Sequence, residues 1–172
     1  GKETRTIDGK SYVLEAPHIV IAVGTTPGLP PGIVVDHQTV ISSDDILSLP
    51  RLPRTMTVVG AGIIGLEYAT VFATLGIQVT LVDKRTEILD MVDREFVDAL
   101  TYLARDRGMT LRLGEEVTGV EPGANGQGVV LMKSGKRFAT EMILVSAGRQ
   151  GATEALTLDK AGLGADERGR LV

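Results

Sequence analysis

The chain has 172 residues, of which 43% are hydrophobic and 3% aromatic, and its formal net charge is −4. This length allows one domain or one and a part, and the scattered charges with few aromatic rings argue against nucleic acid as a main partner. No apolar run approaches the roughly 20 residues of a membrane helix and cysteine is absent, so we expect a cytoplasmic protein without disulfides or a membrane partner.

The first predicted elements are a hairpin and a buried strand. Residues 1–15 alternate polar and apolar side chains around Asp8 and Gly9, a pair typical of the tight turn between two short strands. The near-continuous apolar run 18–23 predicts a strand buried on both faces. Proline and glycine are then frequent through Gly32, which indicates a loop.

A short helix and a stiff connector are predicted next. The helix would span residues 40–47, with Ser42 as its N-cap and Asp45 three residues further on. The connector, residues 49–53, carries two prolines. We take it as the boundary between a first segment, residues 1–50, and the unit that follows.

A glycine motif follows a short apolar strand at residues 57–59. Gly60, Gly62 and Gly65 have the G-x-G-x-x-G spacing of a dinucleotide-binding turn. The first glycine permits the tight turn, the second lets the backbone approach a pyrophosphate, and the third allows close packing of helix on strand. The helix that begins here would aim its free N–H groups at the phosphates. The predicted contacts are Gly60, Ala61, Gly62, Ile63, Ile64 and Gly65.

An acidic residue stands where the same fold needs one. The helix is predicted to end at Gly76, and the next strand, residues 78–82, runs into Asp83. A dinucleotide-binding fold places a carboxylate about 20 residues after the first glycine, where it accepts a hydrogen bond from a ribose hydroxyl. An acid at the end of a strand also caps the loop that follows, so this structural role stays open for Asp83.

Two cations come directly after this acid. Lys84 and Arg85 lie where the 2′-phosphate of NADP would project, although a basic pair in a surface loop is usually solvated. An acid alone would favour NAD by repelling that phosphate. An acid followed by two cations is therefore the pattern expected of a site that accepts both NAD and NADP.

The rest of the chain completes an α/β pattern. A second helix is predicted from Asp93 to Gly108, with one apolar face. Three short strands then form an antiparallel meander where a helical crossover would be usual. We expect a Rossmann-like parallel sheet with helices on its faces and this meander as a crossover. The apolar face is Phe96, Val97, Leu100, Leu103 and Ala104, and the later strands are predicted at 109–113, 117–120, 128–132, 137–139 and 142–146.

These motifs together resemble a known family. The strand and loop at 21–24, the fingerprint at 60–67, the meander and residues 147–149 are similar to the pyridine-nucleotide-binding domain of the two-dinucleotide flavoprotein reductases, which include dihydrolipoamide dehydrogenase and glutathione reductase. Within this family, residues 82–85 and 146–153 resemble the branch of soluble pyridine nucleotide transhydrogenases. The disulfide reductases usually carry a proline and an asparagine where Gln150-Gly151-Ala152 stand.

The resemblance implies a flavoenzyme that passes hydride from NADPH to FAD and then to NAD. Residues 1–50 would be the C-terminal part of a split FAD-binding domain, 51–149 the NAD(P)-binding domain, and 150–172 a return segment towards the FAD domain. Because both ends of the sequence look cut, we expect a piece of a longer protein. Its partners would be NAD(H), NADP(H) and the FAD-binding domain of the same full-length chain. The intact protein would be a homodimer. The piece alone should bind nucleotide weakly and catalyse nothing.

Two further positions are assigned to the nicotinamide half of the ligand. Family members place the glutamate that matches Glu67 beside the nicotinamide, although a surface glutamate near a helix N-terminus is common. Gly148 follows the last parallel strand, at the edge where open sheets bind ligands. His18 and His37 are expected to be structural or exposed, because no nucleophile and acid accompany them. No catalytic or metal-binding residue is predicted within the chain.

Two other functions stay open. One is the NAD-binding domain of a disulfide reductase like dihydrolipoamide dehydrogenase. In that family the redox cysteine pair lies on the flavin domain, so the absence of cysteine here decides nothing. The other is a non-catalytic module that senses nucleotide, which would bind NAD tightly by itself.

Overall fold

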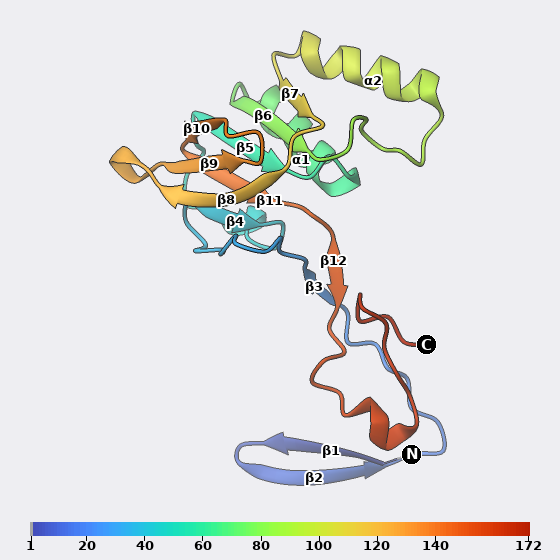
Figure 1. Cartoon of the computed structure of the whole chain (residues 1–172). Coiled ribbons are helices and arrows are strands. Elements are labelled where there is room, and N and C mark those ends of the chain that lie inside the picture. The colour runs from blue at the N-terminus through green and yellow to red at the C-terminus, as the bar shows by residue number, and fades with distance from the viewer. Residues whose placement is uncertain (1) are drawn as a thin grey trace. The chain divides into compact units, whose positions relative to one another are not determined.

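The computed structural model describes residues 2–172, and the chain divides into two compact units (Figure 1). One unit is Pro27–Gly148, and the other combines the residues up to Thr26 with Arg149–Val172. This division differs from the predicted boundary near residue 50. The assignment of the predicted segments to FAD and to NAD(P) stays a prediction.

A parallel sheet of five strands forms the centre of the unit Pro27–Gly148. Neighbouring strands are parallel throughout, and most of their residues are apolar and buried, as expected for a sheet covered on both faces. In spatial order the strands are β4 (Val40–Ser42), β11 (Met142–Val145), β5 (Thr55–Val59), β6 (Gln78–Asp83) and β7 (Thr110–Leu113).

Two helices connect strands of this sheet. α1 (Ile63–Thr74) joins β5 to β6, and α2 (Arg94–Asp106) joins β6 to β7. Each ends as predicted at a glycine with positive φ, 84° at Gly76 and 80° at Gly108. At the first of these, the N–H of the next residue donates to a carbonyl five residues back at 3.1 Å, which closes the last turn.

The predicted meander is confirmed as an antiparallel sheet in the order β10-β9-β8. Its strands are β8 (Val117–Pro122), β9 (Gly128–Met132) and β10 (Arg137–Thr140), and the short 3-10 helix η2 (Ala124–Gly126) lies in the connection between the first two. The meander leads directly into β11. It thus replaces the helix that would otherwise connect β7 to β11.

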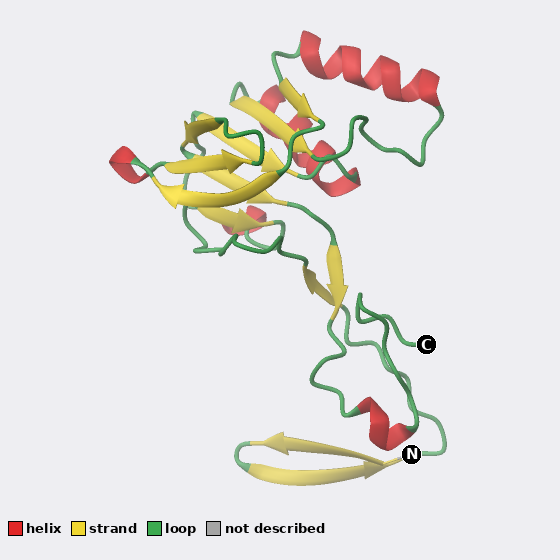
Figure 2. Cartoon of the chain, viewed as in Figure 1, coloured by secondary structure: helices red, strands yellow, loops and turns green. Residues whose placement is uncertain are grey.

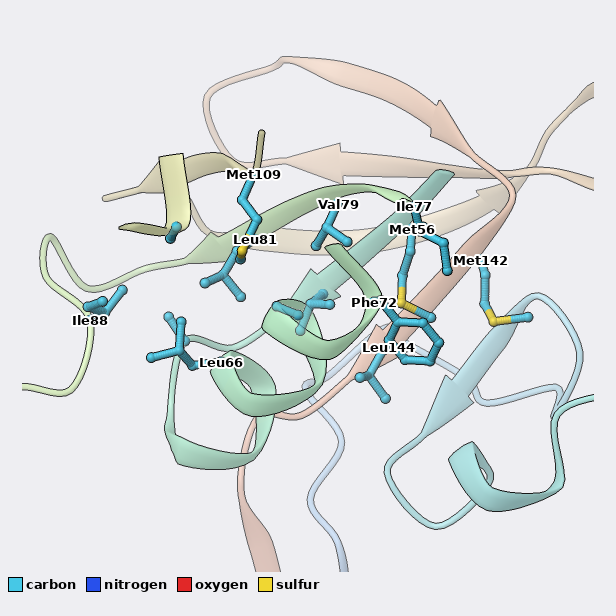
Figure 3. Packing of buried hydrophobic residues seen from close by; sticks show 14 of the residues in the cluster. Met56, Leu66, Phe72, Ile77, Val79, Leu81, Ile88, Met109, Met142 and Leu144 are labelled. Atoms are coloured by element: carbon cyan, nitrogen blue, oxygen red, sulfur yellow. The ribbon is translucent and has the colours of Figure 1, made fainter. Parts of the chain in front are cut away.

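The two faces of the parallel sheet bury different side chains. In β5, Met56 and Val58 belong to a cluster with residues of both helices, whereas Val59 belongs to a second cluster with residues of the meander. Figure 3 shows the first cluster, in which Phe72 of α1 lies near Met142 and Leu144 of β11. This unit therefore has three layers, helices, parallel sheet and meander (Figure 2). The predicted α/β fold is confirmed. Both helices pack against the same face of the parallel sheet, and the meander packs against the other.

The predicted helix at residues 40–47 is wrong. Residues Val40–Ser42 form the edge strand β4, which pairs with β11, and only η1 (Ile46–Ser48) is helical. The polar pair nevertheless makes a contact of the capping-box kind, because the Asp45 carboxylate accepts from the backbone N–H and the hydroxyl of Ser42, both at 2.8 Å. A capping-like spacing is therefore satisfied here by a turn that ends a strand.

The predicted apolar face of α2 is wider than the face that packs. Val97 and Ala104 are buried and Leu100 packs against the same cluster. Phe96 and Leu103 are 69% and 49% exposed. The helix contacts the core through a narrow stripe at spacings of three and four residues, so apolar positions on its flank stay outside.

The other unit begins with the predicted hairpin. β1 (Lys2–Ile7) and β2 (Lys10–Glu15) are antiparallel with Ile7 opposite Lys10, and the two turn residues have φ of 50° and 74°. These values fit a two-residue turn with both residues left-handed, for which an Asp-Gly pair is well suited. The same unit contains β12 (Arg149–Gly151), the short 3-10 helix η3 (Leu158–Ala161) and the first two residues of β3 (Thr25–Pro27).

The buried strand predicted at residues 18–23 is not observed. The run is exposed throughout, with Val20 at 87%, and within the described residues 2–172 it has no strand partner. An apolar run records a tendency to be buried, but a strand forms only where a neighbouring strand accepts its hydrogen bonds.

Candidate nucleotide-binding site

The glycine motif forms the turn between β5 and α1, and two of its glycines are required by the protein's own packing. Gly60 has a φ of 109°, and a Cβ placed there would lie 2.6 Å from the carbonyl oxygen of Ser146. A Cβ on Gly65 would overlap the carbonyl oxygen of Gly60. Helix and strand therefore approach each other more closely at these positions than a side chain would allow.

Gly62 differs from these two. Its φ is −76°, which any residue adopts, and the nearest atom to a Cβ placed there is Nη2 of Arg85 at 4.0 Å. Nothing in the packing of the chain thus requires a glycine at this position. The bare backbone leaves space beside the turn, as a ligand that approaches the main chain would need.

The N-terminus of α1 opens at this turn. Gly62 is its N-cap and supplies no side-chain cap, and the first turn contains no acidic residue. The first amides of the helix have no intrahelical acceptor, and the helix dipole adds positive potential at this end. Ile63 is 58% exposed, so the turn is accessible from solvent. Open amides beside a bare backbone suit a phosphate group.

Asp83 lies at the end of β6 beside the turn. The residue is 8% exposed, and its Oδ2 accepts the backbone N–H of Ala61 at 2.6 Å. Its Oδ1 accepts the backbone N–H of Arg85 at 2.8 Å. Burial alone would raise the pKa of Asp83, but the hydrogen bonds from Arg85 and Ala61 outweigh it and hold the pKa below the ordinary value of 3.8. The carboxylate is thus ionised at neutral pH and also fixes the turn.

Arg85 completes an ionic cluster over this carboxylate. Its Nε and Nη2 donate to Oδ1 and Oδ2 of Asp83 at 3.1 and 2.9 Å, and its Nη1 donates to Oδ1 of Asp90 at 3.0 Å. The hydrogen bond with Asp83 raises the pKa of Arg85, against the opposing effect of its partial burial. The structural role foreseen for Asp83, capping its loop, is therefore present. Its predicted ribose contact stays a prediction.

The other predicted positions are less closely grouped. Lys84 is exposed and lies close enough to Glu116 to add to the effect of Lys133, whose hydrogen bond lowers the pKa of Glu116. Glu67 is exposed on α1, one turn beyond the N-cap. Gly148 has a φ of 119° and open space around it. The structure thus brings Arg85, but not Lys84, to Asp83.

Sequence reasoning missed Ser146, which follows β11. Its hydroxyl lies 3.0 Å from the carbonyl oxygen of Val59 and 3.1 Å from that of Gly60, and its N–H donates to Val59 at 2.8 Å. These contacts fix the glycine turn from the neighbouring strand. The only signal in the sequence is a polar residue at the end of a predicted parallel strand.

The two histidines lie outside this cluster. Nδ1 of His37 contacts Oδ1 of Asp45 at 2.8 Å, at the turn after β4, and His18 is exposed. Among residues 2–172 no group of three or more histidine or acidic side chains could hold a metal ion. In the same residues no helix combines the length and apolar character needed to cross a membrane.

The chain is similar to known proteins over its whole length. A family model described as "Pyridine nucleotide-disulphide oxidoreductase" matches residues 1–172. A soluble pyridine nucleotide transhydrogenase of Mycobacterium bovis is 49% identical over 154 residues, which cover 90% of this chain and 33% of that protein. Another, from Colwellia psychrerythraea, is 41% identical over 164 residues, with 95% and 35% covered. The chain thus spans about a third of the length of these relatives.

A solved structure shows the same fold. The HOCl-induced flavoprotein disulfide reductase RclA from Escherichia coli, in its Cu(II) complex, superposes with a TM-score of 0.91 at 28% identity and covers 99% of this chain and 38% of that one. The resemblance inferred from the fingerprint and the meander is confirmed. The chain belongs to the pyridine nucleotide-disulphide oxidoreductase family.

Proposed function

We propose that the chain is the pyridine-nucleotide-binding part of an FAD-dependent oxidoreductase that transfers hydride from NADPH to NAD. One observation carries the proposal: a buried, ionised Asp83 is hydrogen-bonded to the turn beside Gly62, where the backbone is bare and the α1 amides are open. That arrangement offers a phosphate site and places a carboxylate where a dinucleotide-binding fold holds a sugar hydroxyl. The names of the relatives, soluble pyridine nucleotide transhydrogenases, support the choice of reaction.

The roles of the residues follow from their positions. The turn Gly60–Gly65, with Ala61, Ile63 and Ile64, would hold the pyrophosphate through backbone amides. Asp83 would accept from the adenosine ribose, and Arg85 with Lys84 would receive a 2′-phosphate. Glu67 and Gly148 would lie along the nicotinamide half. FAD, bound elsewhere in the intact protein, supplies the hydride chemistry, while this chain binds and orients the nucleotide.

The exposed apolar run at residues 18–23 fits the same proposal. Six consecutive apolar or weakly polar residues without a strand partner in the described chain are expected to pair with a segment outside it. The relatives are about three times as long as this chain, which leaves room for such a segment. We assign the run to the FAD-binding domain, within the segment 1–50, and expect the intact protein to be a homodimer.

A disulfide reductase is the second candidate. It is favoured by the likeness to a protein named a flavoprotein disulfide reductase at 28% identity. The two candidates share the nucleotide site and differ in the substrate that the flavin reduces. An assay of the full-length protein with NADPH and NAD analogues, and with a disulfide acceptor, separates them.

The nucleotide site itself is tested by titrating the chain with NAD⁺, NADH, NADP⁺ and NADPH. We expect Asp83→Ala to weaken NAD⁺ by about 1–2 kcal/mol more than it weakens NADP⁺, the value of a hydrogen bond to a charged group, because loss of the contacts with the turn affects both nucleotides alike. Glu121→Gln is a matched control, because Glu121 is an acid that pairs with Arg137 on the meander. Equal losses for both nucleotides would contradict the role given to Asp83.

A further inference from the structure

The guanidinium group of Arg85 has two edges that can each grip an oxyanion, and the structure uses both. The edge formed by Nε and Nη2 faces Asp83, and its two contacts are at hydrogen-bonding distance, 3.1 and 2.9 Å. Nη1, on the outer edge, donates to Asp90 at 3.0 Å. Any further anion that binds Arg85 must therefore compete with one of these two carboxylates.

The two carboxylates are not equally replaceable. The side chain of Asp83 is 7% exposed, and it also accepts backbone N–H groups from Ala61 and from Arg85 itself. The side chain of Asp90 is 59% exposed, and Arg85 is the cation that it contacts within residues 2–172. Separating Asp83 from Arg85 would leave a buried carboxylate without its cation, which is costly. The exposed carboxylate of Asp90 can leave Arg85 and be solvated by water at small cost. The outer edge of Arg85 is thus the exchangeable one.

We propose that Asp90 is a specificity-determining residue, whose carboxylate occupies on Arg85 the place that the 2′-phosphate of NADP would take. The inference rests on the proposed nucleotide site. A nucleotide with only hydroxyls on this ribose has no need of that edge, so NAD binding leaves the Arg85–Asp90 pair in place. The 2′-phosphate must displace Asp90, which weakens NADP relative to NAD. Asp90 acts through Arg85 and is a positioning residue.

The charge of Asp90 can be removed without changing its shape, by Asp90→Asn. We expect this variant to bind NADP⁺ about two- to fivefold more tightly, the range for loss of one exposed ion pair, and to bind NAD⁺ as the wild type does. Titrations followed by amide NMR shifts at low salt suit weak binding and limit screening. Glu87→Gln is the matched control, because Glu87 lies in the same loop but pairs with Arg94 at 2.9 Å. It should change neither affinity.

A double-mutant cycle distinguishes action through Arg85 from direct repulsion of the phosphate. In an Arg85→Gln background, Asp90→Asn should no longer improve NADP⁺ binding, because the pair that it breaks is already absent. An equal gain in both backgrounds, or no gain in either, would overturn the inference while leaving the nucleotide site intact. If the wild-type chain binds neither NAD⁺ nor NADP⁺, the proposed function fails and this inference fails with it.

Discussion

The glycine turn and the loop after β6 lie side by side, but they are held in different ways. At the turn, backbone contacts backbone, and the close approach at Gly60 and Gly65 excludes any side chain. In the loop, the charged side chains of Asp83, Arg85 and Asp90 fix one another. The first arrangement is rigid, whereas the second depends in part on an exposed ion pair. With the nucleotide bound as proposed, such a site would keep its phosphate end constant and adjust its ribose end.

The largest expected effect is at the rigid end. Gly65→Ala would force a Cβ against the hydroxyl of Ser146 and against the carbonyl oxygen of Gly60, a backbone atom that cannot rotate out of the way. We expect the free energy of unfolding to fall by about 3 kcal/mol, as for overpacked interiors, measured by urea denaturation. Gly76→Ala serves as a comparison: the backbone there has a φ of 84°, which strains an alanine, but a Cβ would meet no atom within 4 Å. A stable Gly65→Ala protein would show that the close approach is unnecessary.

The next effect concerns charge and pH. The pKa of Asp83 is lower in the folded chain than its ordinary value of 3.8, so its contribution to stability is present above that value and is lost as the pH falls below it. Asp83→Asn should therefore reduce the free energy of unfolding at pH 7 by about 2 kcal/mol, as expected for lost hydrogen bonds to a charged group. Urea titrations from pH 7 to pH 3 should show the difference between the two proteins shrinking below pH 4. A difference independent of pH would contradict the ionic role.

The smallest effect on stability is expected at Gly62, where the effect on binding is large. Gly62→Ala meets no atom closer than 4.0 Å and should change stability by less than about 1 kcal/mol, since alanine is only a poorer N-cap than glycine. The new methyl group would occupy the space assigned to the pyrophosphate, so we expect affinity for NAD⁺ and NADP⁺ to fall about tenfold, or 1.4 kcal/mol. Titration calorimetry measures the affinity for each nucleotide, and a thermal melt measures the stability of the variant. Unchanged affinity would place the phosphates elsewhere.

The sequence predicted the parts of this site that depend on local geometry. The glycine spacing identified the turn, and the position of the acid after the second strand identified Asp83, because both follow from the length of one strand–helix–strand unit. The contacts of Arg85 with Asp90, and of Ser146 with the turn, depend on how a loop folds back and on which strand lies beside β5. Spacing along the chain carries no such information.

The same limit explains the errors in the fold. Residues 40–47 have a helix-like start, but β11 offers the first three of them a strand to pair with, and this tertiary contact prevails over local preference. The apolar runs 18–23 and 142–146 look alike in sequence. The second is buried between β4 and β5, whereas the first has no strand partner within residues 2–172. Apolar character predicts burial only together with the neighbours that provide it.

The central claim is tested most directly by a crystal structure of the chain with NAD⁺. The account predicts pyrophosphate oxygens within hydrogen-bonding distance of the first amides of α1, above Gly62, and a ribose hydroxyl donating to the Asp83 carboxylate. Arg85 would still contact Asp90 in that complex. A nucleotide bound away from the turn between β5 and α1, or a ribose without contact to Asp83, would contradict the account.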